Sequence, residues 1–261
     1  MNKTGTNIVP VKACEKRRGS KGLAVFTIIM LAAALIPLLT GAVSRGAALR
    51  GQVIRDIQTH RQSHAGSVSY ADADDDWSLI LVNPWNSIPD GYSPTLTKLI
   101  NGQSVDERCY PDLQDMMDDC RAAGLSPLIC SSYRSGQTQE SLYNNKVKSL
   151  AAMGLSQERA KTEAAKVVAL PGTSEHQLGL ALDIVDVNNQ NLDESQEDTE
   201  VQKWLMENSY KYGFILRYPQ DKSDVTGISY EPWHYRYVGK EAAREIYEQG
   251  VCLEEYLESL S

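Results

Sequence analysis

The stretch SEHQLGLALDIV, residues 174–185, decides the fold of this chain. From Leu178 onward its residues alternate in character, which is typical of a β-strand whose successive side chains point to opposite faces. One face has large aliphatic residues that can pack on a core, and the other has small residues and one acid: Leu180, Leu182 and Ile184 against Gly179, Ala181 and Asp183. The small neighbours leave room for a metal ion and a substrate beside Asp183.

Helical and extended patterns surround this strand without a regular order. We predict strands at residues 78–83, 128–130 and 233–238, and helices at residues 111–123, 138–153, 156–168, 201–212 and 240–256. A doubly wound sheet would need a regular alternation of strand and helix, which the sequence lacks. The pattern therefore predicts an α+β fold.

A second short stretch, EPWH at residues 231–234, adds a histidine and a carboxylate. Together, His176, Asp183 and His234 make the three-ligand set of a hydrolytic zinc ion, whose fourth position stays open for water. Glu231 is then left over as a general base. Proline at position 232 bars a regular strand ladder and favours a bend that brings Glu231 and His234 to one cavity.

Each of these two stretches also has a purely structural explanation. The first could be an edge strand with an incidental Asp183 and a hydrogen-bonded His176, and the second an aromatic strand with a chance His234. These are the only two histidines after position 64. Because both stand close to a carboxylate, chance is a poor explanation for the pair.

Arg134 follows the predicted strand at residues 128–130, at the point where a loop begins. Its forked and permanently charged guanidinium suits a substrate carboxylate or a developing oxyanion. Gln139, five residues on, is a weaker candidate for a hydrogen bond to substrate. An ordinary surface arginine is the alternative, and spacing alone does not exclude it.

The N-terminal part of the chain predicts a membrane anchor. Residues 1–21 hold six basic residues and one acidic residue, a formal charge of +5, and residues 22–43 contain no charged residue. About 20 apolar residues are enough to cross a bilayer, and the positive-inside rule keeps the basic tail in the cytoplasm. We therefore expect a single-pass protein of the cell membrane whose remaining chain is extracellular. A cleaved signal peptide is the alternative, since small residues occupy positions 42–44, and the protein would then be secreted.

The rest of the chain is acidic, with −13 left after the basic tail is taken from the total of −8. This argues against nucleic-acid binding, which depends on Lys and Arg contacts to phosphate. Residues 44–76 are polar and end in an acidic run, which indicates an extracellular stalk. His60 and His64 lie in this stalk without a third ligand, so solvated positions are the better interpretation. We expect one compact domain at residues 77–261.

Four cysteines follow the predicted anchor: Cys109, Cys120, Cys130 and Cys252. In an oxidising space they permit two disulfides, with three possible pairings. Free thiols in the core are an equal alternative, because cysteine is often buried.

The motifs taken together resemble those of the VanY-type D-alanyl-D-alanine carboxypeptidases. These are zinc peptidases of the group that includes the D-Ala-D-Ala dipeptidases and hedgehog-like domains. The family pattern Ser-x-His-x-x-Gly-x-x-x-Asp, usually with Ala two before the Asp, is matched by Ser174, His176, Gly179, Ala181 and Asp183. The family pattern Glu-x-x-His is matched by Glu231 and His234, and Tyr-Arg-Ser is matched by Tyr133, Arg134 and Ser135. Ser132 stands where relatives often have Gly. The likeness covers about residues 79–238.

The resemblance implies a small antiparallel sheet that carries one zinc ion and is flanked by helices. By this resemblance, His176, Asp183 and His234 are the zinc ligands. Glu231 is the catalytic base and Arg134 acts at the scissile carbonyl, while Ser174 and Gln139 contact the substrate. The implied reaction removes the C-terminal D-alanine from peptidoglycan stem peptides at the outer face of the membrane.

Other functions stay open at this point. An L,D-carboxypeptidase or an endopeptidase acting on the same polymer would differ in pocket shape, which the sequence does not determine. A non-catalytic wall-binding module would not need Glu231. A membrane sensor is disfavoured, because 21 cytoplasmic residues are too few for a signalling domain. The sequence leaves the oligomeric state open.

Overall fold

The computed structural model describes residues 77–261 of the chain. The predicted basic tail, anchor and stalk lie outside these residues, as do His60 and His64. No helix between residues 77 and 261 has the length and apolar character needed to cross a membrane.

A four-stranded antiparallel sheet lies at the centre of the described residues, in the order β3-β4-β6-β5. Its strands are β3 (Pro127–Ser131), β4 (Ala181–Asp186), β5 (Phe214–Leu216) and β6 (His234–Tyr237). The inner strands β4 and β6 pair in a register that puts Asp183 opposite His234. A separate hairpin joins β1 (Leu96–Lys98) to β2 (Ser104–Asp106).

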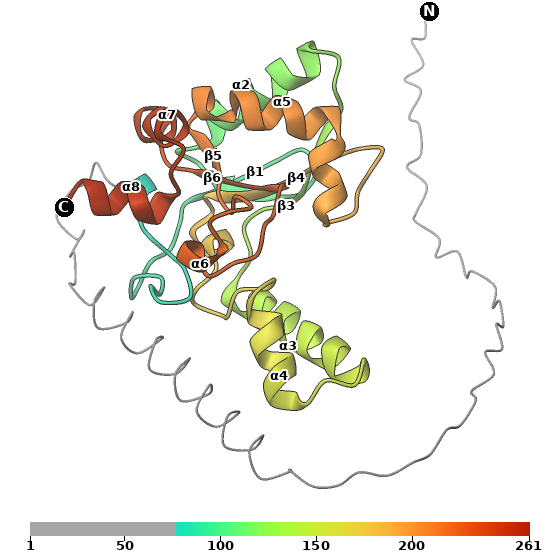
Figure 1. The fold of residues 1–261 in the computed structure, drawn as a ribbon. Coiled ribbons are helices and arrows are strands. Elements are labelled where there is room, and N and C mark those ends of the chain that lie inside the picture. Colours follow the sequence, from blue (N-terminus) through green and yellow to red (C-terminus); the bar gives the residue numbers. More distant parts are fainter. Residues whose placement is uncertain (1–76) are drawn as a thin grey trace, which may run out of the picture. The chain divides into compact units, whose positions relative to one another are not determined.

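Helices lie on both sides of this sheet (Figure 1). On one side are α2 (Tyr110–Ala122) and α5 (Glu200–Asn208), and on the other a hairpin of α3 (Gly136–Ala152) and α4 (Gln157–Ala165) projects away from the strands. The remaining helices are α6 (Ser223–Thr226), α7 (Lys240–Gln249) and α8 (Leu253–Ser259). Short 3-10 helices occur at η1 (Trp77–Leu79), η2 (Glu175–Leu178), η3 (Glu194–Asp198) and η4 (Ser209–Tyr212). This arrangement confirms the predicted α+β class.

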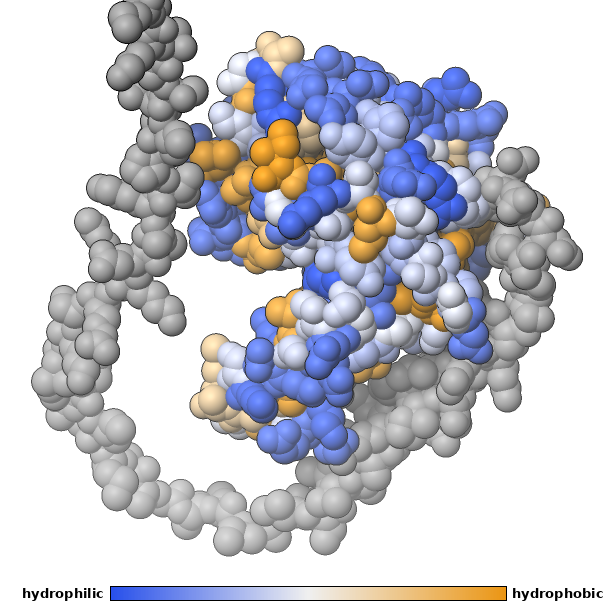
Figure 2. Space-filling model, turned by 180° about the vertical axis from the view of Figure 1, so that it is seen from behind, coloured by the Kyte–Doolittle hydropathy of each residue, from blue (hydrophilic) through white to orange (hydrophobic). Residues whose placement is uncertain are grey.

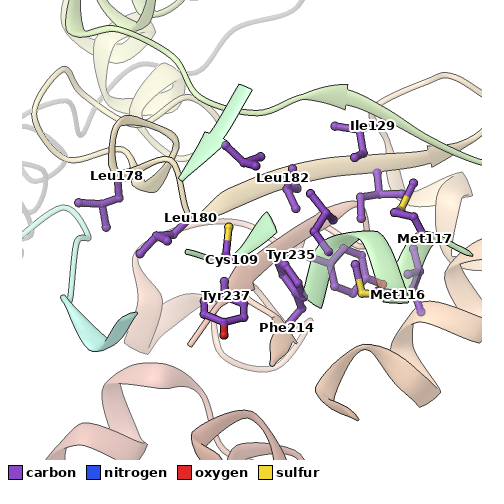
Figure 3. Packing of buried hydrophobic residues seen from close by; sticks show 14 of the residues in the cluster. Cys109, Met116, Met117, Ile129, Leu178, Leu180, Leu182, Phe214, Tyr235 and Tyr237 are labelled. Atoms are coloured by element: carbon purple, nitrogen blue, oxygen red, sulfur yellow. The ribbon is translucent and has the colours of Figure 1, made fainter. Parts of the chain in front are cut away.

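The aliphatic face of β4 enters the main hydrophobic core (Figure 3). Leu180, Leu182 and Ile184 are at most 1% exposed, and they share this core with Met116 and Met117 of α2. Burial of a side chain of this size contributes about 1.5–3 kcal/mol to folding. Because this face of β4 is fixed in the core, the opposite face is held in a defined position.

The predicted strand at residues 78–83 is wrong. The segment begins as η1, and the backbone carbonyls of Ser78 and Ile80 accept hydrogen bonds from the Arg236 guanidinium at 2.8 and 2.9 Å. A buried arginine thus takes up carbonyl groups that a neighbouring strand would otherwise have bound.

Two predicted helices are each divided into two elements. The pattern at residues 240–256 forms α7 and α8, because Gly250 caps α7 with a left-handed φ of 66°. The pattern at residues 201–212 forms α5 and then tightens into η4 at Ser209. Among the described residues, Cys109, Cys120, Cys130 and Cys252 are all free thiols, and all but Cys130 are buried, as the free-thiol alternative expects.

Candidate active site

The register of β4 and β6 brings the three predicted ligands together. Oδ1 of Asp183 lies 3.1 Å from Nδ1 of His234 and 3.4 Å from Nε2 of His176. The three donor atoms all lie within 4.8 Å of one another, and all three residues are buried. Two nitrogens and one oxygen so arranged could hold a metal ion.

The 3-10 turn η2 positions His176. The turn ends at Gly179, whose φ of 75° lies in the left-handed region, and a Cβ at this position would lie 3.1 Å from the backbone nitrogen of Asp106. Gly179 therefore belongs to the turn, and the strand begins only at Ala181. Nδ1 of His176 lies 2.8 Å from the carbonyl oxygen of Ser132, which leaves Nε2 for the site.

Burial and mutual contact set the charges of the three ligands. Burial lowers the pKa of His176 to about 4, so this imidazole is neutral at pH 7. Burial opposes the charge of Asp183, but both histidines outweigh it and hold the pKa of this carboxyl well below its ordinary value. Burial also disfavours the charge of His234, but hydrogen bonding to Asp183 and Glu175 raises its pKa to about 9. At pH 7 the metal-free site thus holds an ionised Asp183, a neutral His176 and a protonated His234, which must give up a proton when a cation binds.

Glu231 reaches the cluster through the predicted bend. Residues 232 and 233 form a turn, in which the His234 amide donates to the Glu231 carbonyl at 3.1 Å. Oε2 of Glu231 then lies 3.6 Å from Nδ1 of His234. Burial raises the pKa of Glu231 to about 8 against the opposing effect of His234. A carboxyl with a pKa near neutrality is suited to take up and release a proton.

Arg134 also contacts Asp183. Its guanidinium donates to Oδ2 of Asp183 at 3.3 Å and to Oε1 of Gln139 at 3.0 Å, while its Nε is buried without a partner. The Gln139 amide nitrogen donates in turn to the Ala169 carbonyl at 2.7 Å. Gln139 therefore holds Arg134 in place, a contact that the sequence did not indicate.

These residues line one cleft with a volume of about 540 Å³. Ser174 is buried in its wall, and α3 contributes Leu142 and Lys146. Leu142, Val167 and Leu192 also line the cleft and are 40–50% exposed, so apolar surface is available to a ligand there. Figure 2 shows a notch between the lobe of α3 and α4 and the rest of the domain. The cleft is therefore large enough to hold the terminal residue of a peptide together with residues that precede it.

A second group of charged side chains, missed by the sequence analysis, lies on the other side of the His234 ring. Oε1 of Glu175 accepts hydrogen bonds from Arg217 at 2.7 Å and from Arg236 at 2.8 Å. Arg217 also donates to both carboxylate oxygens of Glu254, at 2.8 and 2.7 Å. We call these four residues, none with a side chain more than 9% exposed, the buried ion cluster.

The sequence did contain a signal for this cluster. Arg217 and Arg236 stand within the apolar and aromatic stretches FILRY and HYRYV. Arginine is almost never fully buried unless it is paired, so each of these positions requires a carboxylate partner. Glu175 lies within the stretch SEHQLGLALDIV, but the local pattern does not indicate a role for it.

Comparison with known proteins agrees with this geometry. The model of the VanY family, described as D-alanyl-D-alanine carboxypeptidase, matches residues 102–240. The chain belongs to the VanY family. A D-alanyl-D-alanine carboxypeptidase of Enterococcus faecalis is 52% identical over 182 residues, which cover 70% of this chain and 66% of that protein. The match thus spans about two thirds of the length of that VanY relative.

Two solved VanY structures have the same fold. VanYB in complex with D-alanine-D-alanine is 50% identical, with a TM-score of 0.66, and the match covers 71% of this chain and 99% of that one. A variant of the VanY D,D-pentapeptidase from a VanB-type resistance cassette, in complex with Zn(II), is 51% identical, with a TM-score of 0.64 and coverage of 69% and 99%.

The donor set of this VanY chain fits a single zinc ion. Imidazole nitrogens and a carboxylate oxygen are ligand types that zinc prefers, and three protein ligands leave its fourth position open. The second ring nitrogen of each histidine faces an oxygen, the Ser132 carbonyl for His176 and the Glu175 carboxylate for His234. Zinc ligands usually have such outer partners. The cofactor of this family member is therefore Zn²⁺.

Proposed function

We propose that this protein is a zinc-dependent carboxypeptidase that removes the C-terminal D-alanine from peptidoglycan stem peptides. The observation that carries the proposal is the position of Glu231. Its side chain is only 12% exposed and its carboxylate lies 3.6 Å from Nδ1 of His234, yet it is not one of the three clustered donors. Membership of the VanY family supports the substrate class.

The catalytic roles are divided between the ligands and Glu231. His176, Asp183 and His234 would hold the zinc ion, which when bound supplies Lewis acidity towards water and a peptide carbonyl. Glu231 accepts a proton from the attacking water as the new C–O bond forms. It then donates that proton to the leaving amine as the C–N bond breaks, which releases D-alanine.

Arg134 stabilises the negative charge that develops on the carbonyl oxygen. Contacts to Asp183 and Gln139 fix its terminal nitrogens, and its buried Nε keeps a donor free for a substrate oxygen. A preorganised cation stabilises a transition state more than it would in solution, because it need not reorient as the charge develops. We assign Ser174, in the wall of the cleft, to substrate binding.

The outer cleft binds the part of the stem peptide that precedes the scissile bond. Lys146 lies about two helical turns along α3 from Gln139 and lines the same cleft. Within residues 77–261, Lys146 has no carboxylate within ion-pair distance. Stem peptides carry acidic groups ahead of their terminal D-alanines, and Lys146 is available to pair with one.

We also propose that the site works at the outer face of the cell membrane. The basic residues 1–21 followed by the uncharged residues 22–43 support this orientation. Protease added to intact protoplasts should degrade the domain without lysis of the cells. A domain that is degraded only after lysis would contradict the orientation.

The test of the activity uses the purified full chain and two synthetic stem peptides, a pentapeptide ending in D-Ala-D-Ala and the tetrapeptide that lacks the last residue. Mass spectrometry should show loss of one alanine from the pentapeptide only, blocked by a chelator and restored by zinc. Cleavage of the tetrapeptide alone would indicate an L,D-carboxypeptidase, and an internal cut would indicate an endopeptidase. Zinc binding without any cleavage would leave a non-catalytic wall-binding module.

A further inference from the structure

Two buried polar atoms without hydrogen-bond partners face each other beside the active site. They are Oε2 of Glu175 and Nε2 of His234, 3.5 Å apart. This separation is just beyond an ordinary N–H to oxygen hydrogen bond, and a small rotation of either side chain would close it. Unpartnered polar atoms are rare in protein interiors, so a facing pair indicates one interaction.

The carboxylate of Glu175 is held from its other oxygen. Arg217 and Arg236 both donate to Oε1, while Oε2 is left towards His234. Both guanidinium groups approach Oε1 closely, at 2.7 and 2.8 Å, as the charged partners of an ionised carboxylate do. The acceptor that His234 meets is therefore a fixed anion.

The two arginines are themselves satisfied elsewhere. Arg217 binds Glu254, and Arg236 donates to the backbone carbonyls of Ser78, Ile80 and Tyr237. The buried ion cluster holds two positive and two negative side chains, so it carries no net charge. Its single open acceptor is the oxygen that faces His234.

We infer that Glu175 is a positioning residue that fixes the tautomer of His234. With its proton on Nε2 and donated to Glu175, the imidazole leaves the lone pair of Nδ1, which lies beside Asp183, free for the zinc ion. The hydrogen bond also sets the ring orientation and raises the basicity of Nδ1. This inference rests on the proposed role of His234 as a zinc ligand.

The two histidines are thus supported differently. His176 is held through Nδ1 by a neutral acceptor, the Ser132 carbonyl, and offers Nε2. His234 is held through Nε2 by a charged acceptor and offers Nδ1. The charged acceptor, Glu175, is held in turn by two arginines, one in β6 and one in the segment after β5.

The first test compares Glu175→Gln with Glu254→Gln in the full chain. Each variant removes one negative charge from the buried ion cluster and leaves Arg217 with one carboxylate, but only Glu175 contacts His234. Zinc affinity is measured by competition with a coloured chelator. We expect Glu175→Gln to weaken zinc binding by about 10–100-fold, the usual effect of an outer partner, and Glu254→Gln to bind zinc as the wild type does. Equal affinity in all three proteins, or equal losses in both variants, would overturn the inference.

A second measurement needs no variant and therefore does not depend on whether either variant folds. Nitrogen NMR of the zinc-loaded wild type identifies which ring nitrogen of His234 carries the proton, and the chain has only four histidines to assign. A proton on Nε2 supports the inference, and a proton on Nδ1 overturns it. If the wild type binds no zinc, or His234→Ala leaves zinc affinity unchanged, the proposed function fails instead.

Discussion

Two glutamates approach opposite sides of the same histidine, and their environments give them opposite properties. Glu231 lies 3.6 Å from Nδ1 of His234 on the cleft side, and Glu175 lies 3.5 Å from Nε2 on the core side. Burial raises the pKa of Glu231 to about 8, whereas Arg217 and Arg236 overcome burial and lower the pKa of Glu175. Counter-charge, and not burial, separates a carboxyl that can exchange protons from one that serves as a fixed anion.

The largest expected effect separates the two glutamates by rate. Glu231→Gln should lower the turnover of a D-Ala-D-Ala pentapeptide by about 10²–10⁴-fold, because the proton acceptor is lost. Its zinc content, measured by mass spectrometry, should equal that of the wild type. The exposed Glu207→Gln serves as the matched control. Wild-type turnover in Glu231→Gln would contradict the role of Glu231 as the proton acceptor.

The next effect is on stability and has opposite signs for the two residues. In zinc-free protein at pH 7, Glu175→Gln should lower the free energy of unfolding by about 3–5 kcal/mol, because it leaves buried arginine charge unpaired. Glu231→Gln should raise it, since at pH 7 the folded protein must keep this carboxyl largely protonated while the unfolded chain leaves it ionised. Urea unfolding checks both, and a loss of stability in Glu231→Gln would contradict the assigned environment.

The pH dependence of stability follows from the same pKa directions. The folded pKa of Glu175 is lowered, so its contribution is complete above the unfolded value of about 4.5 and is lost as the pH falls below it. The difference in unfolding free energy between the wild type and Glu175→Gln should therefore become smaller below pH 4.5. The pKa of Glu231 in the folded protein is raised to about 8, so the loss of folding stability that Glu231 causes grows as the pH rises from 4.5 to 8. Unfolding free energies measured between pH 3 and 9 test both trends, and a gap that stays constant would count against them.

A smaller effect on turnover is expected for the arginine on the cleft side of His234, which differs from the two arginines on the core side. Arg217 and Arg236 are occupied by protein oxygens, whereas Arg134 keeps a buried donor free. Arg134→Lys retains the charge but loses this donor, so turnover should fall by about 10²–10³-fold with unchanged zinc affinity. Arg121→Lys, in an exposed pair, is the control. If Arg134→Lys were fully active, the free donor would have no role in catalysis.

The smallest effect concerns the outer cleft. Lys146→Gln should raise the KM for a stem pentapeptide by less than tenfold, as befits a partly exposed ion pair of about 0.2–1 kcal/mol. The KM for a short acetylated D-Ala-D-Ala peptide should not change. Lys148→Gln, exposed on the same helix, is the control. Equal changes for both peptides would show that Lys146 acts on the site and not on the upstream residues.

Local spacing explains why the residues of the cleft could be chosen from sequence. His176 and Asp183 sit within eight residues on a turn and a strand, and Pro232 marks the bend that brings Glu231 to His234. The structure brings these residues together because the antiparallel register of β4 and β6 pairs Asp183 with His234. Such patterns are short enough to be visible in the sequence.

The core side was not predictable in the same way. Glu175 finds its partners 42 and 61 residues away, at Arg217 and Arg236, and no local pattern links them. The wrong strand at residues 78–83 has the same origin, because its carbonyl groups bind Arg236. Gln139 lies only five residues from Arg134, but its amide nitrogen is fixed by the Ala169 carbonyl 30 residues further on, and this contact depends on tertiary structure.

The position of Glu254 in α8 gives the domain an order of assembly. Glu254 follows every residue of the cleft in the chain, so synthesis delivers this carboxylate after all of them. Until α8 has been made and docked, Arg217 has only Glu175 as a charged partner, and the buried ion cluster lacks one of its two carboxylates. The last described helix therefore completes the buried ion cluster, whose charge balance depends on a segment far from the other three residues in sequence.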